Sequence, residues 1–233
     1  MLFRSSPLGE RYRFVALDLP GHGMSAPAQD PKYTYSLPGY AQIVAGFAEK
    51  LGIDNALLAG WSLGGHIILE ASGRMQKSVG CMIFGAPPVG KPMAAEAFIR
   101  HPLVPLLFKN ELYDEEAAAL TATFFIPGSE IPPFFHDDMR RTDGRTREAL
   151  WISIGEGCYT DEVEIVANFK KPLAVVHGEE DQLINLLYIK GLNMPTLWRD
   201  EIQIIPDAGH TPQWEQPEKF NRLLMEFIED CSQ

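Results

Sequence analysis

Ala59-Gly60-Trp61-Ser62-Leu63-Gly64-Gly65 is the stretch that decides the fold, because it joins two segments with different hydrophobic periods. The short apolar run at residues 55–59 is typical of a buried strand. After the stretch, apolar residues recur at the 3.6-residue period of a helix, at Leu63, Ile67, Ile68, Ala71 and Met75. The sequence therefore predicts a tight turn that leads from a β-strand into an α-helix.

The turn contains the pattern Gly-x-Ser-x-Gly at Gly60, Ser62 and Gly64, which in a strand–turn–helix context indicates a nucleophilic serine. A backbone that lifts a serine hydroxyl clear of such a turn is strained and brings strand and helix close together. We therefore expect no room for a side chain at Gly60 and Gly64. Leu63 would present its N–H at the helix N-terminus, where developing negative charge is favoured. The alternative is an ordinary glycine-rich turn that happens to contain a serine.

The composition predicts a globular protein of one domain, or of one domain with an inserted lobe. The chain has 233 residues, of which 45% are hydrophobic and 22% charged. Its net charge of −11 would repel phosphates and anionic lipids, so we expect neither nucleic-acid nor membrane partners. No apolar stretch is long enough for a signal peptide or a membrane span.

The number and spacing of the cysteines argue against disulfide bonds and against a metal site. Cys81, Cys158 and Cys231 are odd in number and far apart, and none forms a Cys-x-x-Cys pair. A disulfide framework or a zinc site is therefore not expected, which suits the reducing cytoplasm. We expect a cytoplasmic protein with no metal and no other cofactor.

Buried strands and amphipathic helices alternate along much of the chain. A helix is expected from the N-cap Ser36 to the stop at Gly52, and a last helix has Pro217 in its first turn. Strands are expected at residues 11–18, 55–59, 79–84, 173–176 and 202–205. This alternation predicts an α/β fold with a mostly parallel sheet and helices on both faces.

The alternation breaks between residues 89 and 168, where helical patches at 94–100 and 115–124 are joined by proline-rich segments. We predict an inserted helical cap at 89–168 on an α/β core formed by residues 1–88 and 169–233. Several large apolar residues of the cap would cover an acyl pocket, or would simply form the core of the cap: Phe98, Leu106, Phe108, Phe124 and Trp151.

A serine nucleophile needs a base within hydrogen-bond reach, and that base needs a carboxylate to hold it. His210 follows the strand at 202–205, and Glu179, Glu180 and Asp181 follow the strand at 173–176. The carboxyl ends of parallel strands meet at one edge of a sheet, so we expect these groups to gather beside Ser62. Asp181 is the favoured acid, with the two glutamates as competitors.

Four segments together resemble the serial signatures of the α/β-hydrolase fold. They are Asp-Leu-Pro-Gly-His-Gly-Met-Ser at 18–25, residues 60–65, His-Gly-Glu-Glu-Asp at 177–181, and Ala-Gly-His at 208–210 followed by Glu-Gln-Pro at 215–217. The resemblance implies Ser62 as nucleophile, Asp181 as orienting acid and His210 as base, with small carboxylic esters or lactones as substrates.

Three further stretches, at 30–36, 85–89 and 141–145, resemble the metal-independent N-acyl-homoserine lactonases of this fold. Two other functions stay open: hydrolysis of a carbon–carbon bond in a diketone by the same triad, and binding of a small apolar ligand without catalysis. Trp61 would line the acyl pocket or shield the turn. His22 is expected to be structural, and His136 with its two neighbouring aspartates is expected to be a solvated charge run, not a metal site.

The sequence departs from the family pattern at its start. The family begins with further strands and a His-Gly loop that donates a second N–H to the oxyanion, whereas only residues 1–10, read as the tail of a helix, precede the strand at 11–18. We therefore expect missing N-terminal strands, and a gap or a re-pairing beside the strand at 55–59. Loss of one oxyanion donor costs about 10²–10³ in turnover. An exposed sheet edge would allow a homodimer.

Overall fold

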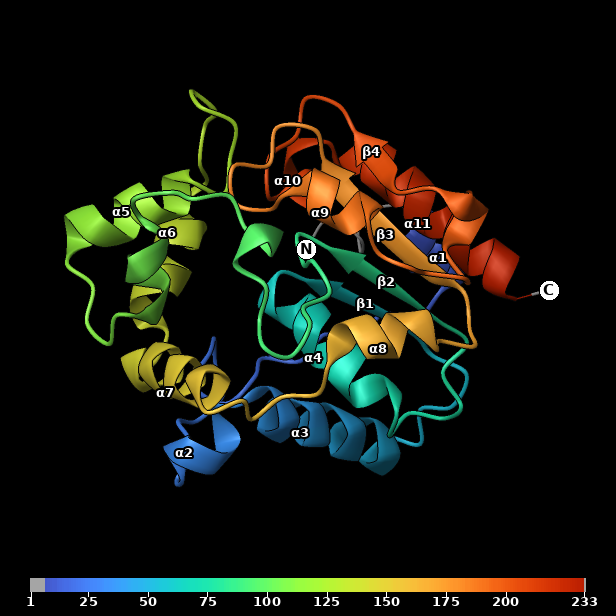
Figure 1. The fold of residues 1–233 in the computed structure, drawn as a ribbon, viewed down its shortest axis with the longest axis horizontal. Coiled ribbons are helices and arrows are strands. Elements are labelled where there is room, and N and C mark those ends of the chain that lie inside the picture. The colour runs from blue at the N-terminus through green and yellow to red at the C-terminus, as the bar shows by residue number, and fades with distance from the viewer. Residues whose placement is uncertain (1–6, 233) are drawn as a thin grey trace.

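A parallel sheet of four strands forms the centre of the protein, as described by a computed structural model that covers residues 7–232 (Figure 1). The strands lie side by side in sequence order: β1 (Leu57–Trp61), β2 (Gly80–Phe84), β3 (Leu173–Gly178) and β4 (Gln203–Ile205). Four of the five expected strands are therefore confirmed, with bounds shifted by one or two residues. The α/β class and the parallel sheet are confirmed as well.

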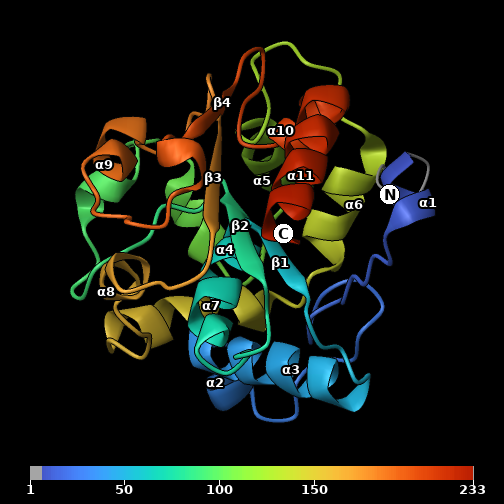
Figure 2. The same cartoon turned by 90° about the vertical axis from the view of Figure 1, so that its right-hand side faces the viewer.

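Helices cover both faces of this sheet (Figure 2). On one face, Cys81 and Ile83 pack against α4 (Leu63–Ser72), α8 (Glu162–Ala167) and α9 (Leu186–Lys190). On the other face, Met82 and Phe84 pack against α1 (Pro7–Arg11) and α11 (Pro217–Cys231). The alternation of buried side chains along β2 therefore builds two cores, one on each side of the sheet.

The first long helix, α3 (Leu37–Lys50), starts and ends as its sequence predicts. The Ser36 hydroxyl accepts a hydrogen bond from the Gly39 N–H at 3.1 Å, and Pro38 occupies the first turn. Gly52, just beyond the helix, has a φ of 60°, which a glycine adopts without strain. The helix packs against α4 and so supports the element that carries the Ser62 turn.

The strand expected at residues 11–18 is wrong. Helix α1 ends at Arg11, and residues 13–19 form neither helix nor strand in the described part of the chain. Along the sheet, Ala59 of β1 is level with Met82 and Ala174. The latter two are fully buried, whereas Ala59 is exposed, because β1 has a neighbour on one side only. Among residues 7–232, no strand pairs with this outer side of β1, and the expected gap beside it is confirmed.

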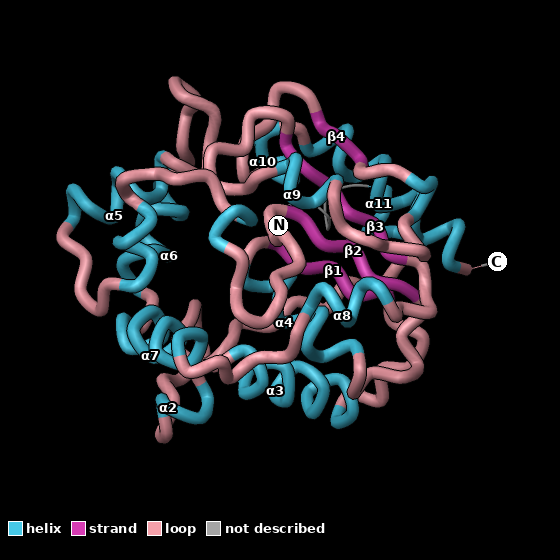
Figure 3. Tube along the Cα trace, viewed as in Figure 1, coloured by secondary structure: helices cyan, strands magenta, loops and turns pink. Residues whose placement is uncertain are grey.

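Residues 89–168 contain helices and loops but no strand, which Figure 3 shows as the strand-free part of the trace. The bounds of the cap at 89–168 stay a prediction, since its last helix, α8, packs on the sheet. Residues 1–6 of the predicted N-terminal helical tail lie outside the described residues. The helices of this segment are η1 (Ala95–Ala97), η2 (Val104–Phe108), α5 (Asp114–Ala122), α6 (Pro133–Arg141), α7 (Gly144–Gly155) and α8.

Short helices complete the framework around the sheet. They are α2 (Pro31–Thr34), which packs against α7, η3 (Trp198–Asp200) and α10 (Pro212–Glu215). Among the helices of residues 7–232, none combines the length and the apolar character that crossing a bilayer requires.

Candidate active site

The turn after β1 holds Ser62 in a strained backbone conformation. Ser62 has φ 50° and ψ −120°, a region that side chains rarely adopt, and its N–H donates to the Phe84 carbonyl oxygen at 2.8 Å. Trp61 ends β1 and Leu63 begins α4, so Ser62 is the single residue between strand and helix. The predicted strand–turn–helix unit is confirmed, together with its strain.

Close packing at this turn involves Gly60 and Gly65, not Gly64. A Cβ atom on Gly60 would overlap the backbone of Gly64 and Gly65, and one on Gly65 would overlap the Ala86 side chain. A Cβ on Gly64 would meet no atom within 4 Å. The expected crowding at Gly64 is therefore wrong, because the helix starts at Leu63 and turns Gly64 outward while Gly65 faces the segment after β2.

A chain of hydrogen bonds runs from Ser62 through His210 to Asp181. His210 Nε2 lies 3.0 Å from Ser62 Oγ, and His210 Nδ1 lies 2.9 Å from Asp181 Oδ2. With the proton on Nδ1, that nitrogen donates to the carboxylate and Nε2 accepts the serine hydroxyl. The competing acids Glu179 and Glu180 are exposed, whereas Asp181 is buried. The structure thus brings together the three residues that the sequence singles out.

Asp181 is held in its ionised form although it is buried. Its Oδ1 accepts the N–H groups of Leu183 at 2.8 Å and Ile184 at 3.2 Å. Burial alone would raise the pKa of Asp181, but the charge and hydrogen bond of His210 and the Leu183 N–H hold this pKa below its usual range. Nearby, burial lowers the pKa of His177. A carboxylate that stays charged can stabilise a positive imidazole ring at His210.

Trp61 supports His210 from the side of the turn. Its Nε1–H donates to the His210 carbonyl oxygen at 2.6 Å, and its ring centroid lies 5.7 Å from the imidazole. Phe124, from the segment after α5, packs against the same imidazole at 5.5 Å and against Trp61 at 5.8 Å. Of the two roles expected for Trp61, these contacts match shielding of the turn, and they show that the helical segment reaches the site.

Leu63 is placed as an anion-binding donor. It is the first residue of α4, and within residues 7–232 no acceptor is found for its backbone N–H. The N–H groups of a first helical turn have no partner inside the helix, and the helix dipole adds positive potential there. An oxygen that gains negative charge next to Ser62 could therefore receive a hydrogen bond from Leu63.

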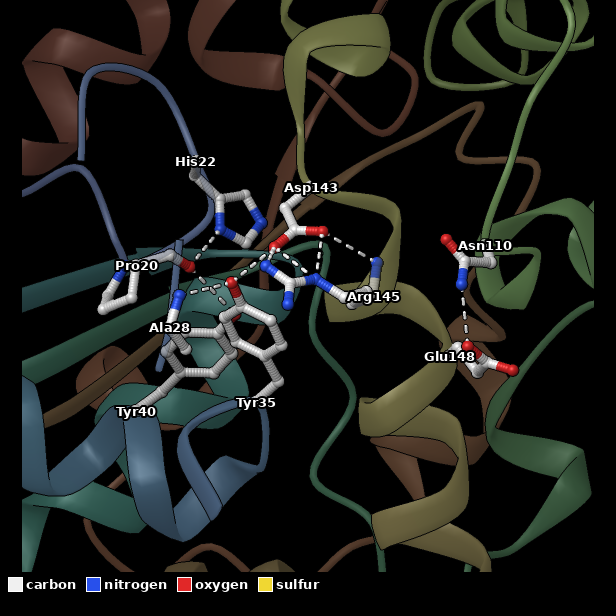
Figure 4. A network of polar contacts seen from close by, with 9 residues as sticks. All are labelled: Pro20, His22, Ala28, Tyr35, Tyr40, Asn110, Asp143, Arg145 and Glu148. Atoms are coloured by element: carbon white, nitrogen blue, oxygen red, sulfur yellow. Dashed lines mark hydrogen bonds and ion pairs between the residues drawn. The ribbon is translucent and has the colours of Figure 1, made fainter. Parts of the chain in front are cut away.

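His22 belongs to a structural network at the base of α7 (Figure 4). Its Nδ1 lies 3.2 Å from the Pro20 carbonyl oxygen, and burial lowers the pKa of its imidazole. In the same network the Tyr35 hydroxyl donates to Asp143 Oδ2 at 2.8 Å, and Arg145 pairs with that carboxylate. Two of the stretches that resemble the lactonases, 30–36 and 141–145, therefore meet here.

His136 is half-buried, and its Nε2 lies 3.2 Å from the Asp114 carbonyl oxygen. Within residues 7–232 no three histidine, cysteine or acidic side chains come together as a metal-binding group.

One histidine–carboxylate pair, His66 and Glu162, was not predicted from the sequence. His66 Nδ1 lies 2.9 and 3.0 Å from the two carboxylate oxygens of Glu162, which is fully buried. Glu162 also exchanges two hydrogen bonds with Val89: its Oε2 accepts the Val89 N–H and its own N–H donates to the Val89 carbonyl, both at 2.9 Å. The partners are 96 residues apart and share no motif, so no local pattern could have paired them.

Known proteins resemble this chain over nearly its whole length. A solved structure of the N-acyl homoserine lactonase AidH in complex with N-butanoyl homoserine superposes with a TM-score of 0.94 at 33% identity, covering 100% of this chain and 85% of that one. A 2-hydroxy-6-oxononadienedioate/2-hydroxy-6-oxononatrienedioate hydrolase of Pseudomonas sp is 28% identical over 93% of this chain and 77% of its own length.

A third relative is the dihydrolipoyllysine-residue acetyltransferase component of the acetoin cleaving system of Cupriavidus necator. It is 28% identical over 97% of this chain, and the chain spans 59% of its length. The model of the alpha/beta hydrolase family matches residues 2–223. Strand order, turn and sequence agree, and the chain belongs to the alpha/beta hydrolase family.

Proposed function

We propose that the protein is a serine hydrolase that opens N-acyl homoserine lactones and cleaves related small carboxylic esters. The observation that carries this proposal is the chain of hydrogen bonds from Ser62 Oγ through His210 to Asp181, at 3.0 and 2.9 Å. Acyl transfer by a serine requires an accessible hydroxyl beside an imidazole, and a carboxylate that contacts the other nitrogen of that imidazole. Ser62, His210 and Asp181 have this arrangement.

The first half of the reaction forms an acyl-enzyme. Ser62 Oγ attacks the carbonyl carbon while His210 Nε2 takes the hydroxyl proton, and Asp181 stabilises the resulting imidazolium. The carbonyl oxygen gains negative charge and receives the Leu63 N–H. The C–O bond to the alcohol then breaks as His210 returns its proton to the leaving oxygen.

Water completes the cycle. The water oxygen attacks the acyl carbon while His210 Nε2 takes a proton from the water. The bond between the acyl carbon and Ser62 Oγ then breaks as His210 passes that proton to Oγ. For a lactone, the released alcohol and the acid are parts of one opened product. These reaction steps use the substrate, water, the side chains of Ser62, His210 and Asp181, and the backbone N–H of Leu63.

Two observations favour a neutral lactone as substrate. AidH, an N-acyl homoserine lactonase, shares 33% identity with this chain, and aromatic rings of Trp61 and Phe124 flank His210. An apolar acyl chain suits such surroundings. A dienedioate, the substrate in the name of the Pseudomonas relative, carries two carboxylates that a chain of net charge −11 would repel.

Carbon–carbon hydrolysis is the second candidate. It is supported by relatives named 2-hydroxy-6-oxononadienedioate/2-hydroxy-6-oxononatrienedioate hydrolase, which match 93% of the chain. A substrate panel separates the two functions: N-butanoyl and N-hexanoyl homoserine lactone, a p-nitrophenyl ester, and a 2-hydroxy-6-oxo-dienedioate. We expect turnover of the lactones and the ester and none of the dienedioate. Faster turnover of the dienedioate than of the lactones would support the second candidate instead.

The same panel applied to Ser62→Ala tests the nucleophile. We expect kcat to fall by about 10⁶-fold, as when a serine triad loses its nucleophile. Ser129→Ala, at an exposed loop position, is the matched control and should keep full activity. Equal activity of the wild type and Ser62→Ala would refute the proposal.

A further inference from the structure

Glu215, the last residue of α10, bridges the His210 loop and the helical segment. Its Oε1 accepts the N–H of Ile126 at 2.8 Å, and its Oε2 accepts the N–H of Gly209 at 2.8 Å. The Thr211 hydroxyl lies 3.0 Å from Oε2. One carboxylate thus serves two backbone donors that are far apart in the sequence, together with a side-chain hydroxyl.

The partners of Glu215 lie on both sides of His210. Gly209 precedes the imidazole-bearing residue and Thr211 follows it, so the carboxylate fixes the backbone at each end. The Thr211 hydroxyl also reaches the Phe124 carbonyl oxygen at 3.1 Å. Trp61 holds the His210 carbonyl from another direction. The backbone of His210 is therefore tied to three separate segments.

The contact with residues 124–126 is close as well as polar. A Cβ atom on Gly209 would lie 3.1 Å from the Ile126 nitrogen and 3.2 Å from the Phe124 oxygen, which is tighter than ordinary contact. Gln182, next to Asp181, donates to the Phe125 carbonyl oxygen at 2.8 Å. The backbone of residues 124–126 is thus bonded both to the loop that carries the imidazole and to the loop that carries the acid.

From this geometry we propose that Glu215 is a positioning residue: it holds His210 at hydrogen-bond distance from Ser62 by locking the 209–211 loop onto residues 124–126. Its effect on turnover rests on the proposed function. Glu215 acts on His210 through Gly209, Thr211 and Ile126, which its carboxylate contacts. A loosened loop lets the imidazole drift from Ser62, and a misplacement of about 1 Å costs roughly 10² in rate.

The test variant is Glu215→Gln, which keeps the side-chain length. An amide has one acceptor oxygen, and its NH₂ group would face an N–H donor, so either Ile126 or Gly209 loses its partner. Glu218→Gln is the matched control, since Glu218 is exposed and lies three residues after the end of α10. Thr211→Val is a second variant that removes only the hydroxyl, with nearly unchanged volume.

For lactone and ester turnover we expect Glu215→Gln to lower kcat by about 10²-fold with KM changed less than about two-fold. The rate of Ser62 labelling by a fluorophosphonate should fall in parallel, since both depend on the Ser62–His210 distance. Thr211→Val should give a smaller loss in the same direction, and Glu218→Gln none. An unchanged kcat in folded Glu215→Gln, or an equal loss in Glu218→Gln, overturns the proposal.

Hydrogen exchange separates this proposal from the proposed function. Amides of residues 124–128 and 207–212 should exchange faster in Glu215→Gln than in the wild type or Glu218→Gln, whether or not the protein turns over a substrate. If the wild type neither turns over esters nor labels, the proposed function fails. Exchange at these amides then still decides whether Glu215 holds the loop: unchanged protection overturns the positioning role, and if Glu215→Gln does not fold, the Thr211→Val exchange decides.

Discussion

The described part of the chain, residues 7–232, contains two histidine–carboxylate pairs with almost the same N···O distance. His210 Nδ1 lies 2.9 Å from Asp181, and His66 Nδ1 lies 2.9 Å from Glu162. Both carboxylates are buried. The distance and burial of the pair therefore do not distinguish a candidate base from a structural contact.

The difference lies in what each pair touches next. His210 belongs to a loop and places Nε2 at 3.0 Å from Ser62. His66 belongs to α4, and its partner Glu162 binds the backbone of Val89 and so joins α4, the segment after β2 and the start of α8. The candidate active site is therefore marked by the strained Ser62 next to His210 Nε2, more than by the histidine–carboxylate pair itself.

The largest contrast should come from neutralising the two carboxylates in turn. Asp181→Asn removes the group that holds the Nδ1–H tautomer of His210, and kcat should fall by about 10⁴-fold. Glu162→Gln should change kcat per folded molecule by less than about ten-fold, because Glu162 does not touch His210. Steady-state kinetics on the lactone, corrected for folded protein, measures both. Equal losses in the two variants would mean that the pairs are not functionally different.

The free energy of unfolding should depend strongly on Glu162, although kcat should depend on it little. Glu162→Gln weakens the contacts of the fully buried Glu162 side chain with His66 and Val89, so the free energy of unfolding should fall by about 3 kcal/mol. Urea unfolding followed by circular dichroism gives this value. Glu164→Gln, on the exposed side of the same helix, is the control and should change it little. A loss below about 0.5 kcal/mol would contradict a structural role for the pair.

The His66–Glu162 pair joins α4 to the segment after β2, and Gly65 lies where these two elements touch. Gly65→Ala places a methyl group on Ala86, and this overpacking should lower the free energy of unfolding by about 1–3 kcal/mol and also reduce activity. Gly64→Ala meets open space and should stay within about 1 kcal/mol of the wild type. Thermal unfolding of the two variants compares them, and the reverse order would contradict the observed packing.

The smallest effect should be a pH dependence of stability due to His66. Burial opposes a charge on His66, but the Glu162 carboxylate outweighs it and raises the pKa of the imidazole. A group with a raised folded-state pKa stabilises the protein fully below its unfolded pKa, about 6.5 for histidine, and loses that contribution as the pH rises through the folded value. The difference in unfolding free energy between wild type and Glu162→Gln should therefore be constant below about pH 6.5 and shrink above it. Urea unfolding at a series of pH values on both sides of about 6.5 measures this difference. A difference that grows with pH would contradict the assignment.

Local patterns predicted most elements but not their partners. The segments at 79–84, 173–176 and 202–205 are mainly apolar, and each contains a strand. The strand at 55–59 moved to Leu57–Trp61 because the ladder with β2 continues up to Trp61 and Phe84. The run at 11–18 looks equally apolar, yet it forms no strand, since strand formation depends on a neighbour that no local pattern reveals.

The site followed from the sequence as far as its motifs reach. Ser62 and His210 stand out by their turns, whereas the choice among residues 179–181 needed the structure, which buries only Asp181. The roles of Glu162 and Glu215 depend on contacts across 73 and 89 residues, with Val89 and Ile126. Contacts of that kind are decided by tertiary packing, so sequence spacing could not indicate them.

Covalent labelling shows directly whether Ser62 is an activated nucleophile, because a fluorophosphonate reacts only with an activated serine. Mass spectrometry of the peptide that contains Ser62 should show one adduct in the wild type and in folded His66→Asn, and none in Ser62→Ala. His210→Asn should label at least about 10³-fold more slowly, because the base is gone. Labelling of His210→Asn at the wild-type rate, or no labelling of the wild type at all, would mean that His210 does not activate Ser62 as a nucleophile.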